Sequence, residues 1–140
     1  MEPFRIIDAN VNRLGEGLRV IEEALRFLFN DVELTAGLKE IRTTMNTAIS
    51  SQDLYKKLLE NRDSEADPGA VAEFDSGNIG RADTADVLRA SFKRCEEASR
   101  VIEEYAKAVD IDASVFKDVR FKLYGIEKKV MLRYFKENIH

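Results

Sequence analysis

Apolar residues recur along this chain at spacings of three and four, which is the period of an amphipathic helix. From about residue 3 to residue 29, one helix face carries Val11, Leu14, Leu18, Ile21, Leu25 and Leu28. Similar runs predict a second helix through residues 34–49, a short one near 53–59, a fourth over about 84–109 and a fifth over about 112–134. Asp31 and Asp112 stand where helix caps are expected. No useful length of period-two alternation predicts a strand, so we expect an all-α protein.

The second half of the chain partly repeats the first. Residues 9–27 read ANVNRLGEGLRVIEEALRF, and residues 90–108, 81 positions later, read ASFKRCEEASRVIEEYAKA, with 8 of 19 positions identical. LKEIR at 38–42 and FKDVR at 116–120 form a second matching pair. We therefore predict a helical bundle of four long helices plus a short one, built from two similar helical-hairpin halves with pseudo-two-fold symmetry.

A chain of 140 residues is expected to form a single helical domain over 1–140. The first repeat covers about 4–50, the short helix and a functional loop about 51–83, and the second repeat about 84–135.

Charged residues repeat together with the apolar ones and form a polar stripe on each repeated long helix. The first stripe holds Asn12, Glu16, Arg19, Glu23 and Arg26. The second holds Lys93, Glu97, Arg100, Glu104 and Lys107, while Arg13 and Arg94 lie nearer the apolar edges. One interpretation is a solvated face held by Glu–Arg pairs. The other is a polar cleft between the halves, where arginine binds phosphate and carboxylates hold Mg²⁺. Gly15 and Gly17 mildly favour the second, because glycine inside a helix often marks close approach of a ligand or a partner helix.

Residues 61–83 cannot continue a helix, because the segment holds three of the seven glycines and one of the two prolines. At about 20 residues it exceeds the usual helix–helix connection, so it is either a linker or a functional loop. It groups guanidinium, carboxylate and hydroxyl groups with flexible backbone in Arg62, Asp63, Ser64, Asp67, Pro68 and Gly69. Phosphate and Mg²⁺ handling needs these groups, although ordinary turns share the composition. We predict that Arg62 and Asp63 face one cleft together with Arg13 and Arg94.

Composition excludes several classes of function. A net charge of −4 without a dense Lys/Arg stripe argues against nucleic-acid binding. There is no apolar run of 18 residues and no signal peptide, so we expect a cytoplasmic protein that does not bind membranes. Cys95 is expected in the core, and His140, the only histidine, cannot support a Ser/His/Asp set. The aromatic residues Phe121, Tyr124, Tyr134 and Phe135 favour either core positions or a subunit contact, which leaves a homodimer open.

The strings RIIDANVNRLGEGLRVIEEALRF, LKEIR, ENRDSEADPGA, VLRASFKRCEEASRVIEEYAK and FKDVRFKLYGIEK resemble one family across nearly the whole chain. This is the small monofunctional hydroxymethylpyrimidine-phosphate kinase of thiamin biosynthesis, in its standalone form, a domain otherwise fused to thiamin-phosphate synthase. Gly15, Thr43 and Pro68 stand where the family pattern carries other residues.

The resemblance implies transfer of the γ-phosphoryl group of ATP to 4-amino-5-hydroxymethyl-2-methylpyrimidine phosphate, with ATP and Mg²⁺ as cofactors. It implies catalytic roles for Arg19, Arg62, Asp63 and Arg100. Binding of the substrate or the nucleotide falls to Asn12, Arg13, Glu16, Asp67, Lys93, Arg94 and Glu97. The Mg²⁺ candidates are Glu16, Asp63, Asp67 and Glu97. A non-catalytic helical module that binds thiamin-phosphate synthase or a small phosphorylated ligand remains the alternative.

Overall fold

The computed structural model describes residues 2–51, 53–63, 65 and 83–139. Their regular elements are all helical: α1 (Glu2–Glu23), the π-helix η1 (Ala24–Leu28), α2 (Val32–Ser51), α3 (Leu54–Asn61), α5 (Thr84–Ala106), η3 (Lys107–Val109), α6 (Ser114–Tyr134) and η4 (Lys136–Asn138). The prediction of an all-α bundle with four long helices and a short one is confirmed. None of the described helices is both long and apolar enough to cross a membrane.

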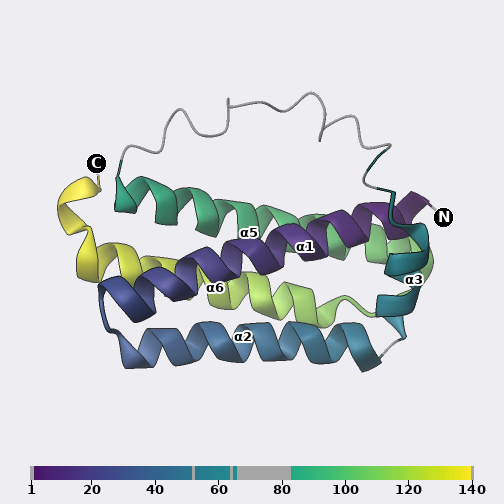
Figure 1. Cartoon of the computed structure of the whole chain (residues 1–140), viewed down its shortest axis with the longest axis horizontal. Coiled ribbons are helices and arrows are strands. Elements are labelled where there is room, and N and C mark those ends of the chain that lie inside the picture. The colour runs from purple at the N-terminus through teal and green to yellow at the C-terminus, as the bar shows by residue number, and fades with distance from the viewer. Residues whose placement is uncertain (1, 52, 64, 66–82, 140) are drawn as a thin grey trace.

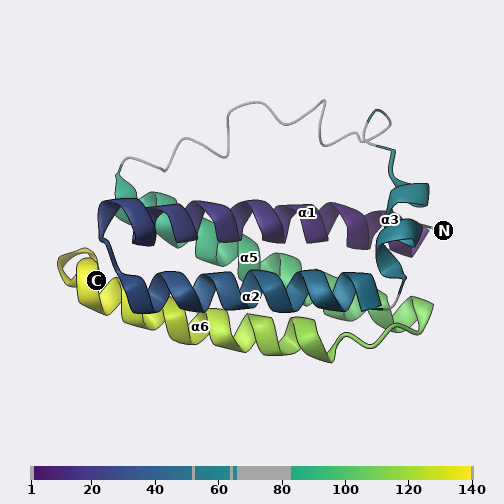
Figure 2. The same ribbon diagram turned by 60° about the horizontal axis from the view of Figure 1, so that its bottom comes forward.

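The long helices form two antiparallel hairpins, α1 with α2 and α5 with α6 (Figure 1). Helix α1 lies against α5 and α2 lies against α6, so each hairpin covers the apolar faces of the other. Figure 2 shows the same arrangement from another side, with α3 at the end of the bundle where α1 begins. Helix α3 contacts both α1 and α2 there, and it is the only described α-helix outside the two hairpins.

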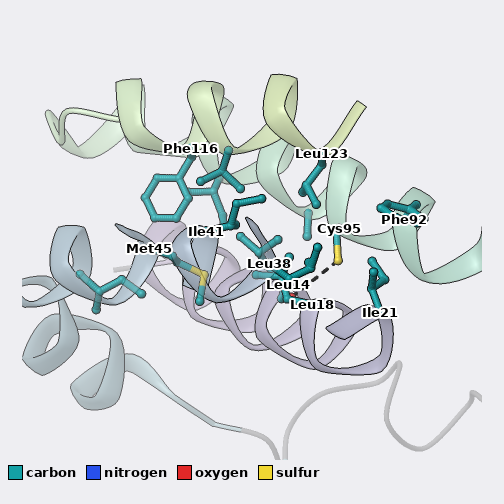
Figure 3. Close-up of a cluster of buried hydrophobic side chains, with 14 of the residues drawn as sticks. Leu14, Leu18, Ile21, Leu38, Ile41, Met45, Phe92, Cys95, Phe116 and Leu123 are labelled. Carbon is teal, nitrogen blue, oxygen red and sulfur yellow. Dashed lines mark hydrogen bonds between the residues drawn. The ribbon is translucent and has the colours of Figure 1, made fainter. Parts of the chain in front are cut away.

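The core consists of the apolar faces predicted from the helical period. The side chains labelled in Figure 3 come from all four long helices: Leu14, Leu18, Ile21, Leu38, Ile41, Met45, Phe92, Cys95, Phe116 and Leu123. All of them are buried, and burial of one such side chain stabilises the fold by about 1.5–3 kcal/mol. The expected core position of Cys95 is confirmed, and desolvation by burial raises the pKa of its thiol to about 12.

Leu28 corrects the predicted apolar face of the first helix, because its side chain is 60% exposed. The α-helical hydrogen bonding ends at Glu23, and the next five residues form the π-helix η1. A π-turn contains one residue more than an α-turn, so it shifts the helical register. Phe29 therefore packs against the core in place of Leu28, and it stacks on Tyr134 with ring centroids 4.3 Å apart.

The junction between η1 and α2 explains part of the aromatic C-terminal segment. Asn30 adopts a left-handed backbone with φ of 50°, and Asp31 Oδ1 then accepts the Leu34 N–H at 2.9 Å, as predicted for a cap. Hydrogen bonding from the Tyr134 hydroxyl is the main cause that lowers the pKa of Asp31, and Arg133 donates to the same carboxylate at 2.7 Å. Tyr134 and Phe135 thus contact Phe29 and the core, whereas Phe121 and Tyr124 remain exposed.

The two halves make the same buried ion pair. Arg42 donates from Nη1 to both carboxylate oxygens of Glu22, at 3.0 and 2.9 Å. Arg120 donates from Nε and Nη2 to Glu103 at 2.6 and 3.0 Å. Glu22 and Glu103 are equivalent in the RVIEE strings, and Arg42 and Arg120 are equivalent in LKEIR and FKDVR. This repeated contact supports the predicted pseudo-two-fold relation, while superposition of the halves by one rotation stays a prediction.

Gly17 and Gly15 differ in what surrounds them. A Cβ on Gly17 would overlap Sγ of Cys95 and lie 3.3 Å from the Ser91 carbonyl oxygen, so this glycine permits close approach of α1 to α5. Cys95 and Leu14, which are equivalent in the repeat, touch here, with Sγ 3.7 Å from the Leu14 carbonyl oxygen. At Gly15 no atom lies within 4 Å of the place of a Cβ. Helix contact therefore accounts for Gly17, and Gly15 borders open space.

Candidate functional site

Three adjoining hollows follow α1, and their volumes are about 550, 690 and 410 Å³. The first, here the Arg62 cleft, lies between the start of α1 and the residues after α3; its polar residues include Arg5, Asp8, Asn10, Asn12, Arg13, Glu16, Arg62 and Asp63. The second, the Tyr55 pocket, lies between α1, α2 and α3; it includes Val11, Gly15, Arg19, Met45, Asn46, Ile49, Ser50, Tyr55 and Leu58. The third, the Arg94 groove, lies between α1 and α5; it includes Lys93, Arg94, Glu97 and Val101.

Shared residues join the three hollows. Asp8, Asn12, Glu16 and Arg62 line both the Arg62 cleft and the Tyr55 pocket. Asn10 and Arg13 line both the Arg62 cleft and the Arg94 groove. A ligand that extended along α1 could therefore contact residues from both halves of the repeat.

Arg62 is held in place by Asp8. Its Nε and Nη2 donate to the two carboxylate oxygens at 2.8 and 2.6 Å, and these hydrogen bonds raise the pKa of the guanidinium. Asp8 is 5% exposed, whereas the Arg62 side chain is 39% exposed. The pair uses one edge of the guanidinium, so Nη1 can still donate to an anion in the cleft. Since a planar guanidinium matches phosphate geometry, this arrangement suits a phosphate-binding arginine.

Arg13 lies where the Arg62 cleft meets the Arg94 groove. The Asn10 amide donates to the Ile6 carbonyl oxygen at 2.9 Å, and its Oδ1 accepts from Arg13 Nη1 at 3.5 Å. Asn10 is buried, so it gives the exposed Arg13 a fixed neighbour at the base of its side chain. At the other side of the cleft, Arg5 donates to the Asp63 carbonyl oxygen at 3.1 Å and ties α1 to the segment after α3.

Arg19 and Arg100 are equivalent in the repeat but have different surroundings. Each lies near the buried glutamate three residues on, at 3.9 Å from Glu22 and 3.7 Å from Glu103, and their side chains are 59% and 56% exposed. Arg100 also binds Glu104 at 2.8 Å, and Glu104 binds Lys107 at 3.2 Å. This part of the second stripe is therefore a solvated helix face held by ion pairs. Arg19 instead lines the Tyr55 pocket.

The family follows from a comparison with known families. The ThiD2 family model matches residues 5–129, which is most of this chain. The chain belongs to the ThiD2 family. Several curated relatives carry the name thiamine-phosphate synthase. The chain is 36% identical over 131 residues to that of Rhodopirellula baltica, a match covering 93% of the chain and 34% of the relative. It is 39% identical over 125 residues to that of Gloeobacter violaceus, covering 89% and 35%.

The match to Nostoc punctiforme thiamine-phosphate synthase has the same form, with 38% identity over 133 residues, 91% of the chain and 35% of the relative. The chain thus spans about a third of the length of these relatives. No solved structure matches it.

In this ThiD2-family chain, most of the predicted site residues line the connected hollows. Arg13, Arg62 and Asp63 line the Arg62 cleft together with Asn12 and Glu16, and Arg19 lines the adjoining pocket. Lys93, Arg94 and Glu97 line the Arg94 groove, so Arg94 lies in a different hollow from Arg62 and Asp63, and Arg13 lines both. Arg100 lines none of the three hollows described here. Asp67 and Pro68 lie outside the described residues.

Sequence reasoning missed several residues of the hollows. Asp8 precedes Asn12 and Glu16 by steps of four, so a helical wheel extended toward the N-terminus could have found it. Asn46, Ser50 and Tyr55 gave no such signal, because α2 and α3 approach α1 only through the tertiary fold.

The carboxylates of the site suit Mg²⁺ that arrives with a nucleotide. No group of three or more metal-binding side chains occurs among the described residues, whereas Glu16 and Asp63 line the Arg62 cleft. Mg²⁺ in nucleotide sites keeps several waters and uses one or two carboxylates together with phosphate oxygens. Glu16 and Asp63 are therefore the carboxylates of this cleft that could hold such an ion.

Glu96 of α5 is buried and lies near the half-buried Glu127 of α6. Glu96 is 5% exposed, and Oε2 has no hydrogen-bond partner among the described residues. The pKa of Glu96 is raised to about 8, mainly by desolvation and next by hydrogen bonding with Glu127. Charge repulsion from Glu127 and Glu97 raises this pKa further, whereas the positive charge of Lys93 lowers it. Glu96 is therefore largely protonated in the native protein at neutral pH.

We expect Glu96→Gln to stabilise the protein at alkaline pH. The native pKa of about 8 lies above the ordinary glutamate pKa of 4.5, so the unfolded chain ionises first and the free energy of unfolding falls as pH rises between these values. Above about pH 8 the loss is complete, and glutamine removes it because its amide stays neutral. Urea denaturation should give the variant a free energy of unfolding more than about 1 kcal/mol higher at pH 8.5, and a smaller difference at pH 5. Glu40→Gln, at an exposed position of α2, controls for loss of charge, and an equal gain there would contradict the prediction.

Proposed function

We propose that this chain is a kinase that transfers the γ-phosphoryl group of ATP to 4-amino-5-hydroxymethyl-2-methylpyrimidine phosphate, giving the diphosphate, in thiamin biosynthesis. Membership of the ThiD2 family and similarity to part of several thiamine-phosphate synthases support a role in this pathway. The observation that carries the reaction type is the connected set of hollows, which brings arginines from separate segments to one side of α1.

Phosphoryl transfer of this kind needs little from the protein beyond position and charge. The attacking oxygen belongs to a phosphate that is already anionic at neutral pH, so no strong general base is required. That agrees with a chain whose only histidine is residue 140. Arg62, fixed by Asp8, can bind one phosphate, and Arg13 and Arg94 can neutralise others, while Glu16 and Asp63 accompany Mg²⁺ of the bound nucleotide.

The order of events is a single in-line displacement. An oxygen of the pyrimidine monophosphate attacks the γ-phosphorus of ATP, the bond from that phosphorus to the bridging oxygen breaks, and ADP leaves with the electron pair. The arginines are expected to bind the oxygens that carry charge throughout this step. Arg62 needs little reorganisation for this role, because Asp8 already holds its guanidinium.

A non-catalytic role is the second candidate. It is favoured by the lengths of the relatives, which are called thiamine-phosphate synthases and are about three times as long as the matched region. In that case the chain would bind a thiamine-phosphate synthase or a small phosphorylated ligand without turnover. Release of ADP that depends on the pyrimidine monophosphate would separate the kinase from this module.

Arg19 and Arg100 provide a matched pair of variants for this assay. We expect Arg19→Ala to lower kcat/KM for the monophosphate roughly 10- to 100-fold, since a hydrogen bond to a charged group contributes about 1.5–3 kcal/mol. Arg19→Lys should lose less, because it keeps the charge without the planar fork. The effect of Arg100→Ala should be smaller, because Arg100 already binds Glu104 and lies outside the hollows. Circular dichroism verifies folding, and wild-type turnover by both alanine variants would contradict a catalytic role of the two stripes.

A further inference from the structure

The Tyr55 pocket differs chemically from the other two hollows. Large apolar side chains of three helices line it, among them Met45, Ile49 and Leu58, and Tyr55 adds an aromatic ring. Among the described residues, the Arg62 cleft and the Arg94 groove have no aromatic residue in their walls, and charged or amide side chains dominate both. A flat heterocycle would therefore bury more apolar surface in the Tyr55 pocket than in either of the other hollows. The volume of this pocket, about 690 Å³, is typical of small-ligand sites.

In the second repeat, a buried glutamate takes the position that Gly15 holds beside this pocket. Gly15 corresponds to Glu96, 81 positions later, and Ile49 corresponds to Glu127, 78 positions later. Beside Gly15 there is open space, whereas the Glu96 side chain is buried near Glu127 between α5 and α6. The repeat thus keeps space between α1 and α2 and fills the equivalent space between α5 and α6.

We propose, resting on the kinase function above, that the Tyr55 pocket binds the pyrimidine ring of the phosphate acceptor, with its phosphate directed toward Arg19 and Arg62. The amide of Asn46 and the hydroxyl of Ser50 offer donors and acceptors for the ring nitrogens and the amino group. ATP then binds in the Arg62 cleft and the Arg94 groove. Arg62 lines both the pocket and the cleft, so the two phosphates meet at this residue.

Charge favours this assignment over the reverse, in which the adenine ring would occupy the pocket. The Tyr55 pocket contains two arginines, and one of them, Arg62, is already paired with Asp8. That suits a monophosphate with close to two negative charges. The cleft and the groove together add the cationic side chains Arg5, Arg13, Lys93 and Arg94 and the carboxylates Glu2, Asp63 and Glu97. This mixture suits a triphosphate that arrives with Mg²⁺, since cationic groups meet its phosphates and carboxylates meet the ion.

Asn46→Trp tests the assignment by placing a large ring at the pocket wall from an exposed position of α2. Isothermal titration measures the Kd of the pyrimidine monophosphate and, separately, of a non-hydrolysable ATP analogue with Mg²⁺. We expect Asn46→Trp to weaken the monophosphate at least tenfold and to change the ATP analogue less than twofold. Asn46→Ala, which leaves the space open, should weaken the monophosphate less. Weakening of the ATP analogue alone, or no change for either ligand, would overturn the assignment.

Tyr55→Ala gives an independent test that holds if the tryptophan variant does not fold. Tyr55 is 58% exposed, so its removal should not disturb the core. Loss of stacking should weaken the monophosphate by about tenfold. Tyr105→Ala, at an exposed tyrosine of α5 outside the three hollows, should leave that Kd unchanged. Equal effects of the two tyrosine variants would refute the pocket assignment. If the wild-type protein bound neither ligand, the kinase function itself would fail, which is a different outcome from binding that these variants do not alter.

Discussion

Replacing Glu103 with alanine should lower the free energy of unfolding by about 3 kcal/mol or more, because it leaves a buried guanidinium without its carboxylate. The Arg120 side chain is only 14% exposed, and Nε and Nη2 both donate to Glu103. Phe121 and Tyr124 contact the guanidinium with ring centroids 4.8 and 6.0 Å from its carbon atom, so water cannot readily replace the lost partner. Urea denaturation at pH 7, followed by circular dichroism, measures the loss.

Glu104→Ala is the matched control for this experiment. Glu104 neighbours Glu103 and also forms ion pairs, but those pairs with Arg100 and Lys107 lie at the surface. Its replacement should leave the denaturation midpoint close to that of the wild type. Glu22→Ala should resemble Glu103→Ala, with a smaller loss because its partner Arg42 is 27% exposed. If Glu103→Ala lowered the free energy of unfolding no more than Glu104→Ala, the buried ion pairs would not stabilise the packing of the two helices within each hairpin.

The second large effect concerns the choice of acceptor. We expect kcat/KM for the pyrimidine monophosphate to exceed that for the unphosphorylated alcohol at least about 1000-fold, a difference on the order of several kcal/mol. Without the phosphate, Arg19 and Arg62 lose their ligand, and the attacking group becomes a neutral hydroxyl. The chain has no internal histidine to remove its proton.

ADP release measured with each acceptor at equal concentration provides the comparison. A tenfold excess of the alcohol should inhibit turnover of the monophosphate only weakly, because the phosphate supplies most of the binding energy. Comparable rates with both acceptors would mean that the arginines do not hold the acceptor phosphate, and the roles of Arg19 and Arg62 would have to be reassigned.

The fold could be predicted from the sequence largely because its determinants are local. Helical periodicity predicted the buried positions of α1, and the repeated strings predicted paired hairpins. The predicted burial of Leu28 was wrong, because nothing local in the sequence indicates the change from α- to π-helix that precedes Phe29 and its contact with Tyr134. The repeated strings contain Glu22 and Glu103, but only the fold shows that these two side chains are buried.

The candidate site was predictable where one helix carries it. Asn12, Arg13, Glu16 and Arg19 follow the turns of α1, and they do line the hollows. The partner of Arg62 was missed, because Asp8 is 54 positions away and nothing in either segment indicates the pairing. The wall formed by Asn46 and Tyr55 likewise depends on tertiary contacts. Arg19 and Arg100 are equivalent in the repeat, but their surroundings differ. Arg19 borders a pocket, whereas Arg100 belongs to an ion-pair network at the surface.

The most direct test of the proposed kinase is ³¹P nuclear magnetic resonance of a reaction containing the protein, MgATP and the pyrimidine monophosphate. If the chain is this kinase, the monophosphate signal disappears as the paired signals of a diphosphate ester and of ADP grow in equal amounts. Growth of inorganic phosphate with ADP, while the monophosphate signal persists, would show ATP hydrolysis without transfer. That result, or an unchanged spectrum from folded protein, would contradict the proposed phosphoryl transfer.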